Sequence, residues 1–131
     1  MNDNNQEKLL KDFPQLYKRF NESITQTSMA MGFQCGNGWF GLIYELSGKI
    51  DSQLKKEPKE SAGRFAVEQV KEKFGRLAYS TIGGSEAISQ LICEAKARSA
   101  KTCETCGKPG KLRRYKGFRQ GTLCDFCNAR F

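Results

Sequence analysis

The chain has 131 residues, of which 38% are hydrophobic and 27% are charged. This length fits one domain, or one modest core with a small appendage. The sequence contains no run of about 18 apolar residues, which argues against a membrane-spanning helix, and its polar start lacks the order of a signal peptide. We therefore expect a cytoplasmic protein, whose reducing surroundings favour metal or redox chemistry for paired cysteines over structural disulfides.

The formal net charge of +8 is unevenly distributed along the chain. Residues 1–94 contain 12 basic and 12 acidic residues, whereas residues 95–131 contain 10 basic and 2 acidic residues, so the whole excess lies at the C-terminal end. A segment of this charge attracts phosphate groups or an acidic protein surface.

The first predicted element follows a polar start. Residues 1–6 are expected to be disordered. Apolar residues between Asp12 and Ile24 recur at helical spacing, which predicts a helix that faces the core. Pro14 is compatible with the first turn of that helix, because the missing N–H has no partner there.

A second helix is predicted after a glycine-rich stretch. Asn37 is its expected cap, and an apolar stripe runs from Trp39 to Leu54. The helix should end before Pro58, because a residue that precedes proline is disfavoured in helical geometry. Residues 55–63 are polar and are expected to form an exposed loop.

Residues 64–82 are compatible with a helix or with a β-hairpin. The alternation from Leu77 to Ile82 favours the hairpin, with a turn near residues 74–76, since a strand needs a partner for its backbone groups. After Gly83 and Gly84, Ser85 is expected to cap a third helix that runs toward Ser99. The apolar face of that helix is predicted to hold Ile88, Leu91, Ile92 and Ala95.

Four cysteines form two CxxC pairs, and 17 residues separate Cys106 from Cys124. Each pair folds into a tight turn that aims two sulfur atoms at one point, and two such turns supply the tetrahedral shell that zinc accepts. We therefore predict one structural Zn²⁺, with four protein ligands and no open position for catalysis. The predicted ligands are Cys103, Cys106, Cys124 and Cys127.

The residues around these pairs extend the prediction to a zinc-ribbon-like module. Gly107 and Asn128 follow the two pairs, and both residue types tolerate the left-handed backbone that such turns use. Residues 111–115 and 118–123 are expected to pair across a turn near Lys116 and Gly117. A dithiol redox pair is the alternative, but it needs one CxxC motif at a helix start and not two matched motifs.

The chain contains no histidine, which excludes the common triads and any His-ligated metal. Two further cysteines remain. Cys93 lies beside an apolar helix stripe and is expected to be buried. Cys35 lies in the glycine-rich stretch, where an exposed nucleophile is conceivable, but the usual base is missing. No enzyme activity is expected.

Basic and aromatic residues alternate between the two cysteine pairs. Arg and Lys bind phosphates, and an aromatic ring stacks on an unpaired base. Alternatively, the charges are only solvated and the aromatic rings pack on the metal site. The candidate contacts for nucleic acid or for a protein partner are Lys111, Arg113, Arg114, Tyr115, Lys116, Phe118 and Arg119.

Three stretches, at residues 33–39, 69–75 and 102–107, together with Thr122–Cys124, resemble a family of small uncharacterised bacterial and phage proteins. The shared features are a Cys-Gly-x-Gly-Trp segment, a Val-Lys-Glu-Lys-Phe-Gly segment and a C-terminal four-cysteine zinc ribbon. The resemblance implies a bacterial cell or a phage-infected host cell as the location, and it carries over no catalytic residue. By analogy with small basic phage proteins, it suggests an anti-defence inhibitor, for example of a CRISPR complex.

The predicted fold class is α+β: a small helical core with a β-hairpin, followed by a C-terminal zinc-ribbon-like module. The expected division is a disordered start at residues 1–6, a core at residues 7–99 and a basic zinc ribbon at residues 100–131. The expected function is non-enzymatic binding of nucleic acid through the basic segment. The alternative is an inhibitor or adaptor that binds an acidic or nucleic-acid-binding surface of a host protein complex.

Overall fold

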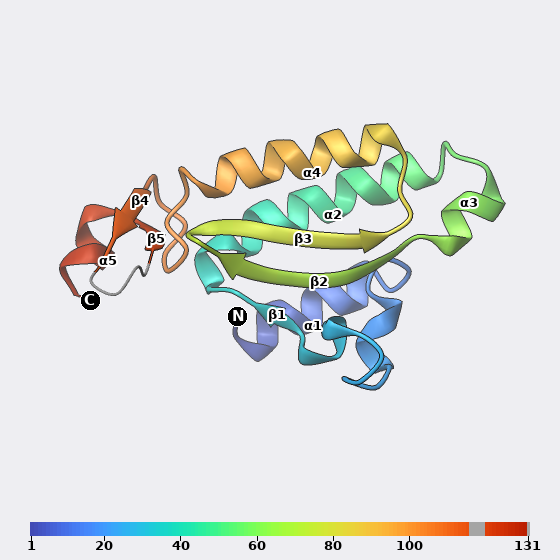
Figure 1. Ribbon diagram of the computed structural model, residues 1–131, viewed down its shortest axis with the longest axis horizontal. Coiled ribbons are helices and arrows are strands. Elements are labelled where there is room, and N and C mark those ends of the chain that lie inside the picture. The colour runs from blue at the N-terminus through green and yellow to red at the C-terminus, as the bar shows by residue number, and fades with distance from the viewer. Residues whose placement is uncertain (116–119, 131) are drawn as a thin grey trace.

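The structure is a computed structural model that describes residues 1–115 and 120–130. Its fold is α+β, as the sequence predicts, with a three-stranded sheet in the core and a two-stranded sheet near the C-terminus (Figure 1). The helices are α1 (Asp3–Asp12), α2 (Phe40–Leu54), α3 (Lys59–Arg64), α4 (Glu86–Ser99) and α5 (Asp125–Ala129). The strands are β1 (Phe33–Gln34), β2 (Ala66–Lys73), β3 (Arg76–Ile82), β4 (Lys111–Arg114) and β5 (Gln120–Leu123).

The larger sheet is built on the predicted hairpin. Strands β2 and β3 pair antiparallel, and the short β1 pairs parallel to β2, so that β3 is an edge strand. Helices α2 and α4 contact each other and run along the hairpin (Figure 1). The prediction of a hairpin over residues 64–82 is confirmed, and its turn consists of Phe74 and Gly75.

The core lies between the hairpin and the helices. Its largest fully buried side chains include Trp39, Tyr17 and Phe65. The hydroxyl of Tyr17 is within 2.6 Å of the Ser47 hydroxyl and 2.9 Å of the Tyr79 hydroxyl, so these buried polar groups satisfy one another. Burial raises the pKa of Tyr17 to about 12, because the charged form would lose its hydration.

The first 24 residues differ from the prediction. Residues 1–6 are not disordered, since α1 begins at Asp3 and the Asn2 side chain caps it by accepting the N–H of Asn5. The backbone nitrogen of Met1 donates to the Cys35 carbonyl at 2.5 Å, which ties this end to β1. The polar composition of the segment does not predict these contacts, because they are made by backbone and amide groups.

The predicted helix from Asp12 to Ile24 is also wrong. Pro14 ends a helix here instead of beginning one: α1 stops at Asp12, and Phe13 leaves helical geometry at φ −130°. Leu16 then accepts a backbone hydrogen bond from Val67 of β2, and only a 3-10 turn follows at Lys18–Asn21. Ile24 is 65% exposed and does not face the core.

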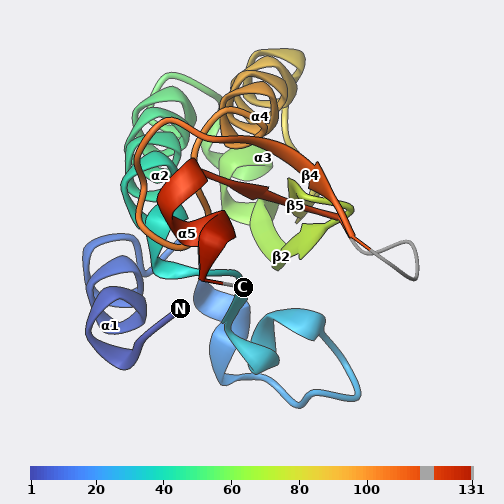
Figure 2. The ribbon, with the colours of Figure 1, turned by 90° about the vertical axis from the view of Figure 1, so that its left-hand side faces the viewer.

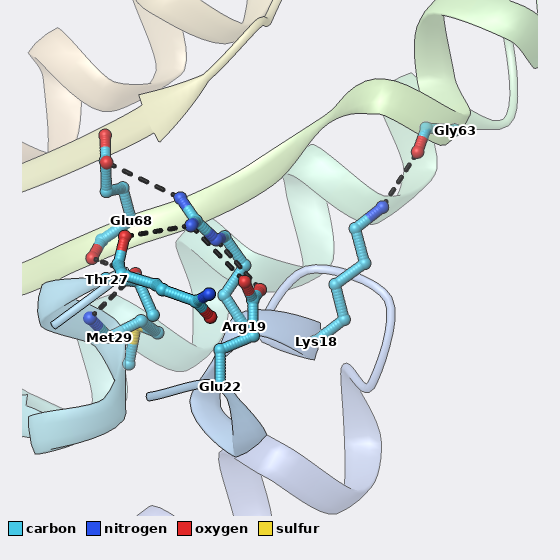
Figure 3. A network of polar contacts seen from close by, with 8 residues as sticks. Lys18, Arg19, Glu22, Thr27, Met29, Gly63 and Glu68 are labelled. Carbon is cyan, nitrogen blue, oxygen red and sulfur yellow. Dashed lines mark hydrogen bonds and ion pairs between the residues drawn. The ribbon is translucent and has the colours of Figure 1, made fainter. Parts of the chain in front are cut away.

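Arg19 fastens this segment to the sheet (Figure 3). Its guanidinium lies 2.9 Å from the Glu22 carboxylate and 3.5 Å from the Glu68 carboxylate on β2. The Thr27 hydroxyl donates to the backbone of the same Glu68 at 3.4 Å. The segment after Pro14 is therefore held to β2 by side-chain contacts, and it does not form the helix that the apolar spacing predicts.

The predicted helices after residue 37 are present as α2 and α4. Ser85 caps α4 as predicted, with its hydroxyl accepting the N–H of Ile88. Asn37 is not the cap of α2, because a 3-10 turn at Asn37–Trp39 precedes the helix and the Asn37 side chain accepts the N–H of Asn2. The expected loop at residues 55–63 is wrong for its second half, because residues 59–63 belong to the short helix α3. In the part of the chain that the structure describes, every helix is too short or too polar to cross a membrane.

Candidate metal centre

The sulfur atoms of Cys103, Cys106, Cys124 and Cys127 all lie within 4.8 Å of one another. The Sγ atoms of Cys106 and Cys124 are 3.6 Å apart. A tetrahedral ion with bonds of about 2.3 Å to sulfur places its ligands about 3.8 Å apart. The four cysteines can therefore hold one metal ion without rearrangement of the backbone.

The first CxxC pair lies in a tight turn before β4. The Cys103 amide donates to the Lys108 carbonyl at 2.7 Å, and the Gly107 amide donates to the Cys103 carbonyl at 2.9 Å. Gly107 has φ +82°, which is the left-handed geometry predicted for it. Gly107 thereby allows the chain to reverse directly behind Cys106.

The second CxxC pair opens a helix. Cys124 is the N-cap of α5, and its sulfur accepts the amide of Cys127 at 3.4 Å. Asn128 therefore lies inside α5 and does not adopt the predicted left-handed geometry. The first turn of a helix already points free N–H groups at its N-cap, so no left-handed residue is needed. The Asn128 side chain instead accepts the Tyr115 hydroxyl at 2.9 Å.

The surroundings of Cys103 favour the thiolate that a metal ligand requires. Burial by itself raises the pKa of this thiol, but backbone amides of Cys124, Cys106 and Thr105 point at the sulfur and outweigh it. The net effect lowers the pKa of Cys103 to about 6, whereas burial and the neighbouring sulfur atoms raise the pKa of Cys127 to about 12. Binding of a metal ion must therefore supply the driving force that deprotonates the remaining cysteines. Four thiolates form a soft donor set, which suits zinc and fills all four positions of a tetrahedral ion.

The glycine-rich stretch before α2 packs directly on the first CxxC turn. The amide of Gly36 donates to the Glu104 carboxylate at 2.8 Å, and the amide of Gly38 donates to the Glu104 carbonyl at 2.7 Å. A Cβ atom at Gly38 would overlap the carbonyl of Cys103. Glycine is needed here because two backbones approach without room for a side chain.

The tip of the β2–β3 hairpin packs on the other side of the same module. The Thr122 hydroxyl donates to the Gly75 carbonyl at 2.5 Å, and the Glu104 amide donates to the Thr122 carbonyl at 2.9 Å. Gly75 has φ +82°, and a Cβ atom there would overlap the Leu112 side chain. Figure 1 shows β4, β5 and α5 beyond the turn that joins β2 to β3, and Figure 2 shows the same three elements from the C-terminal end of the molecule, in front of the core.

Three stretches that are distant in sequence, at residues 33–39, 69–75 and 102–107, therefore meet in space. The glycine-rich stretch, the hairpin turn and the CxxC turns are all in contact at the junction between the core and the ribbon. The stretches contact one another through backbone hydrogen-bonding groups and through glycines that allow close approach. Their shared position explains the glycine content of the stretch before α2, because a Cβ atom at Gly36 or Gly38 would overlap the backbone of the first CxxC turn.

The two remaining cysteines differ from the prediction. Cys93 is exposed on α4 and is not the buried residue expected from its place beside the apolar stripe. Cys35 is buried, and burial raises the pKa of its thiol to about 12. At neutral pH the Cys35 thiol therefore stays protonated, which disfavours it as a nucleophile.

The predicted binding residues have different surroundings. Lys111 and Arg114 are exposed on β4. Arg113 is paired with Asp125 at 2.7 Å, with 16% of its side chain exposed, and its Nε–H donates to the Leu123 carbonyl. Tyr115 packs against the cysteine cluster. Lys116, Phe118 and Arg119 lie outside the described residues.

The structure adds basic residues that the sequence reasoning missed. A groove between the hairpin tip and the ribbon is lined by Lys73, Arg76, Lys96 and Arg114, together with the exposed ring of Phe74. The only local indication of this groove in the sequence is a large aromatic residue, Phe74, at the predicted tight turn between Lys73 and Arg76. The proximity of Lys96 and Arg114 to this turn depends on the tertiary fold.

Comparisons with protein-family models, with curated proteins and with solved structures found no match to this chain.

Proposed function

We propose that this protein is a non-enzymatic module, stabilised by a structural zinc ion, that binds nucleic acid through its basic C-terminal segment. The observation that carries the proposal is the uncompensated positive charge of that segment. Zinc is proposed because four thiolates at tetrahedral spacing match its preferred structural site.

The two acidic residues of the segment both make contacts with other groups of the protein. Glu104 accepts the Gly36 amide at the junction with the core, and Asp125 is paired with Arg113. Among the described residues, no ion pair involves the exposed side chains of Lys96, Lys101, Lys108, Lys111, Arg114 and Arg130. These cations are free to meet the phosphates of a nucleic acid.

The metal site supports this role by holding the basic residues in place. Both strands of the ribbon connect the two CxxC pairs, so Lys111 and Arg114 lie on a hairpin closed at its base by the cysteines. Because the backbone of the hairpin is already restricted, less conformational entropy is lost when its lysine and arginine side chains bind a ligand.

The test is a titration with labelled single-stranded DNA, duplex DNA and single-stranded RNA at several salt concentrations. Phosphate binding releases counterions, so the logarithm of the affinity should fall linearly with the logarithm of the salt concentration. The double variant Lys111→Ala and Arg114→Ala should bind more weakly and show a shallower slope. Each lost phosphate contact should reduce the slope by about 0.7 to 0.9.

The matched control is the double variant Lys56→Ala and Lys59→Ala. It removes the same charge at exposed positions beside and within α3, at the far end of the molecule from the ribbon (Figure 1). It should leave the slope close to that of the unchanged protein. Absence of binding to all three probes at low salt would contradict the proposal and would favour the alternative of an acidic protein partner.

A further inference from the structure

The groove at the junction of core and ribbon combines positive charge with an exposed aromatic ring. It has a volume of about 400 Å³ and lies between the start of β3, the end of α4 and strands β4 and β5. Ligand sites commonly have volumes of about 300–1,000 Å³. Its charged lining residues, within the described part of the chain, are all basic: Lys73, Arg76, Lys96 and Arg114.

Two of these charges face each other across the hairpin. Lys73 and Arg76 are direct cross-strand partners, and both are exposed. Like charges in opposite positions of an antiparallel pair repel each other. The acidic residue nearest in sequence, Glu72, accepts the Gly75 amide at 2.6 Å and so belongs to the turn. A bound anion would relieve the repulsion between Lys73 and Arg76.

The presence of phenylalanine at position 74 is not explained by a contribution to folding. Phe74 has φ 52°, and among the described non-glycine residues it is the one with a positive φ. A bulky residue in this geometry is strained, whereas asparagine or glycine would suit the turn better. Phe74 is 67% exposed, so burial does not compensate for the strain. The Lys73 ammonium lies 6.0 Å from the centre of the ring.

We propose that this groove binds single-stranded nucleic acid, with a base stacked on Phe74 and the adjoining phosphates held by Lys73, Arg76 and Arg114. This inference rests on the proposed function and specifies its ligand. A duplex buries its base faces in its own stack, so an exposed ring has a face to stack on only when bases are unpaired. Strained residues cluster at functional sites, and an exposed aromatic ring inside a basic groove supplies the two groups that bind a single strand.

The decisive variant is Phe74→Asn, which removes the ring and places a residue that tolerates left-handed geometry in the turn. Its thermal stability should equal or exceed that of the unchanged protein. Its affinity for single-stranded DNA or RNA should fall roughly 5- to 150-fold, as expected for loss of one stacked base. Separate titrations with DNA and with RNA of the same sequence show which of the two is preferred.

The matched control is Ile24→Ala. Ile24 is 65% exposed in the N-terminal segment and does not line the groove, so its loss should leave the affinity unchanged. A second readout comes from Phe74→Trp, which should retain binding. The one native tryptophan, Trp39, is fully buried, so quenching of fluorescence by added single strand would report on position 74.

The outcomes separate this inference from the proposed function. Failure of the unchanged protein to bind any nucleic acid overturns both. Binding that prefers duplex, or that is equal in the unchanged protein and in Phe74→Asn, overturns the inference and leaves the proposed function intact. Binding that prefers single strands, falls in Phe74→Asn and quenches Phe74→Trp supports it.

Discussion

The indole N–H of Trp39 donates a hydrogen bond of 2.9 Å to the carbonyl oxygen of Thr102. Trp39 is fully buried at the start of α2, and Thr102 directly precedes the first cysteine of the metal site. This bond joins the core to the ribbon across 63 positions of sequence. Folding of the core and formation of the metal site are therefore expected to support each other.

The contact beside it yields a test of this coupling. Gly38→Ala should destabilise the protein by roughly 1–3 kcal/mol, because the new Cβ atom would overlap the Cys103 carbonyl, which is part of the backbone. Gly41→Ala is the control: its Cβ would meet no atom within 4 Å, and it lies in α2. It should stabilise the helix by about 0.5–1 kcal/mol. Urea unfolding of the zinc-loaded proteins measures both changes, and equal effects would contradict the close packing.

Metal analysis of the purified protein should find one zinc ion per chain. Cys124→Ser should lose the metal, whereas Cys93→Ser, at an exposed position outside the cluster, should retain it. Because the ribbon has only a small cluster of buried residues, a chelator should unfold residues 100–130 first. Hydrogen exchange would show fast amides there and slower ones in α2 and α4. A metal-free ribbon with protected amides would falsify the zinc assignment.

Alkylation of the zinc-loaded protein at neutral pH should modify Cys93 first. Cys93 is exposed, whereas Cys35 is 7% exposed and burial raises the pKa of its thiol to about 12. The reactive thiolate form of Cys35 is therefore scarce until the protein unfolds. Peptide mapping by mass spectrometry gives the two rates. Cys93→Ser should remove the fast reaction, and equal rates at both cysteines would contradict the burial of Cys35.

The stability of the core should fall at alkaline pH. Burial raises the pKa of Tyr17 from 10.0 to about 12, so between these values the folded protein holds a proton that the unfolded chain releases. The contribution is complete below about pH 10 and is lost as the pH rises through about 12.

Urea unfolding at a series of pH values measures this loss. Tyr17→Phe should be less stable at neutral pH by about 1–3 kcal/mol, because Tyr79 loses its hydroxyl partner. It should also show a smaller loss between pH 10 and pH 12. Parallel curves for the two proteins would show that Tyr17 does not govern the alkaline transition.

Elements with strong local signals were predicted well. The stripe from Trp39 to Leu54, the cap at Ser85 and the alternation after Leu77 correspond to α2, α4 and β3. Each signal depends on neighbours within a turn of helix or a few residues of strand. The start of the chain was predicted poorly, because Pro14 is compatible with a helix start as well as with a helix end, and only contacts with β1 and β2 select between them.

The sequence by itself determined the prediction of the four-cysteine site, since two CxxC pairs at this spacing match the ligand pattern of a structural zinc site, and the four sulfur atoms lie together in the structure. It also determined that the excess positive charge lies after residue 94. Only the tertiary structure decided which basic residues lie close together. Lys73 and Arg114 share a groove because Gly75 and Thr122 join the hairpin to the ribbon, and such pairing between distant segments leaves no periodic pattern in the sequence.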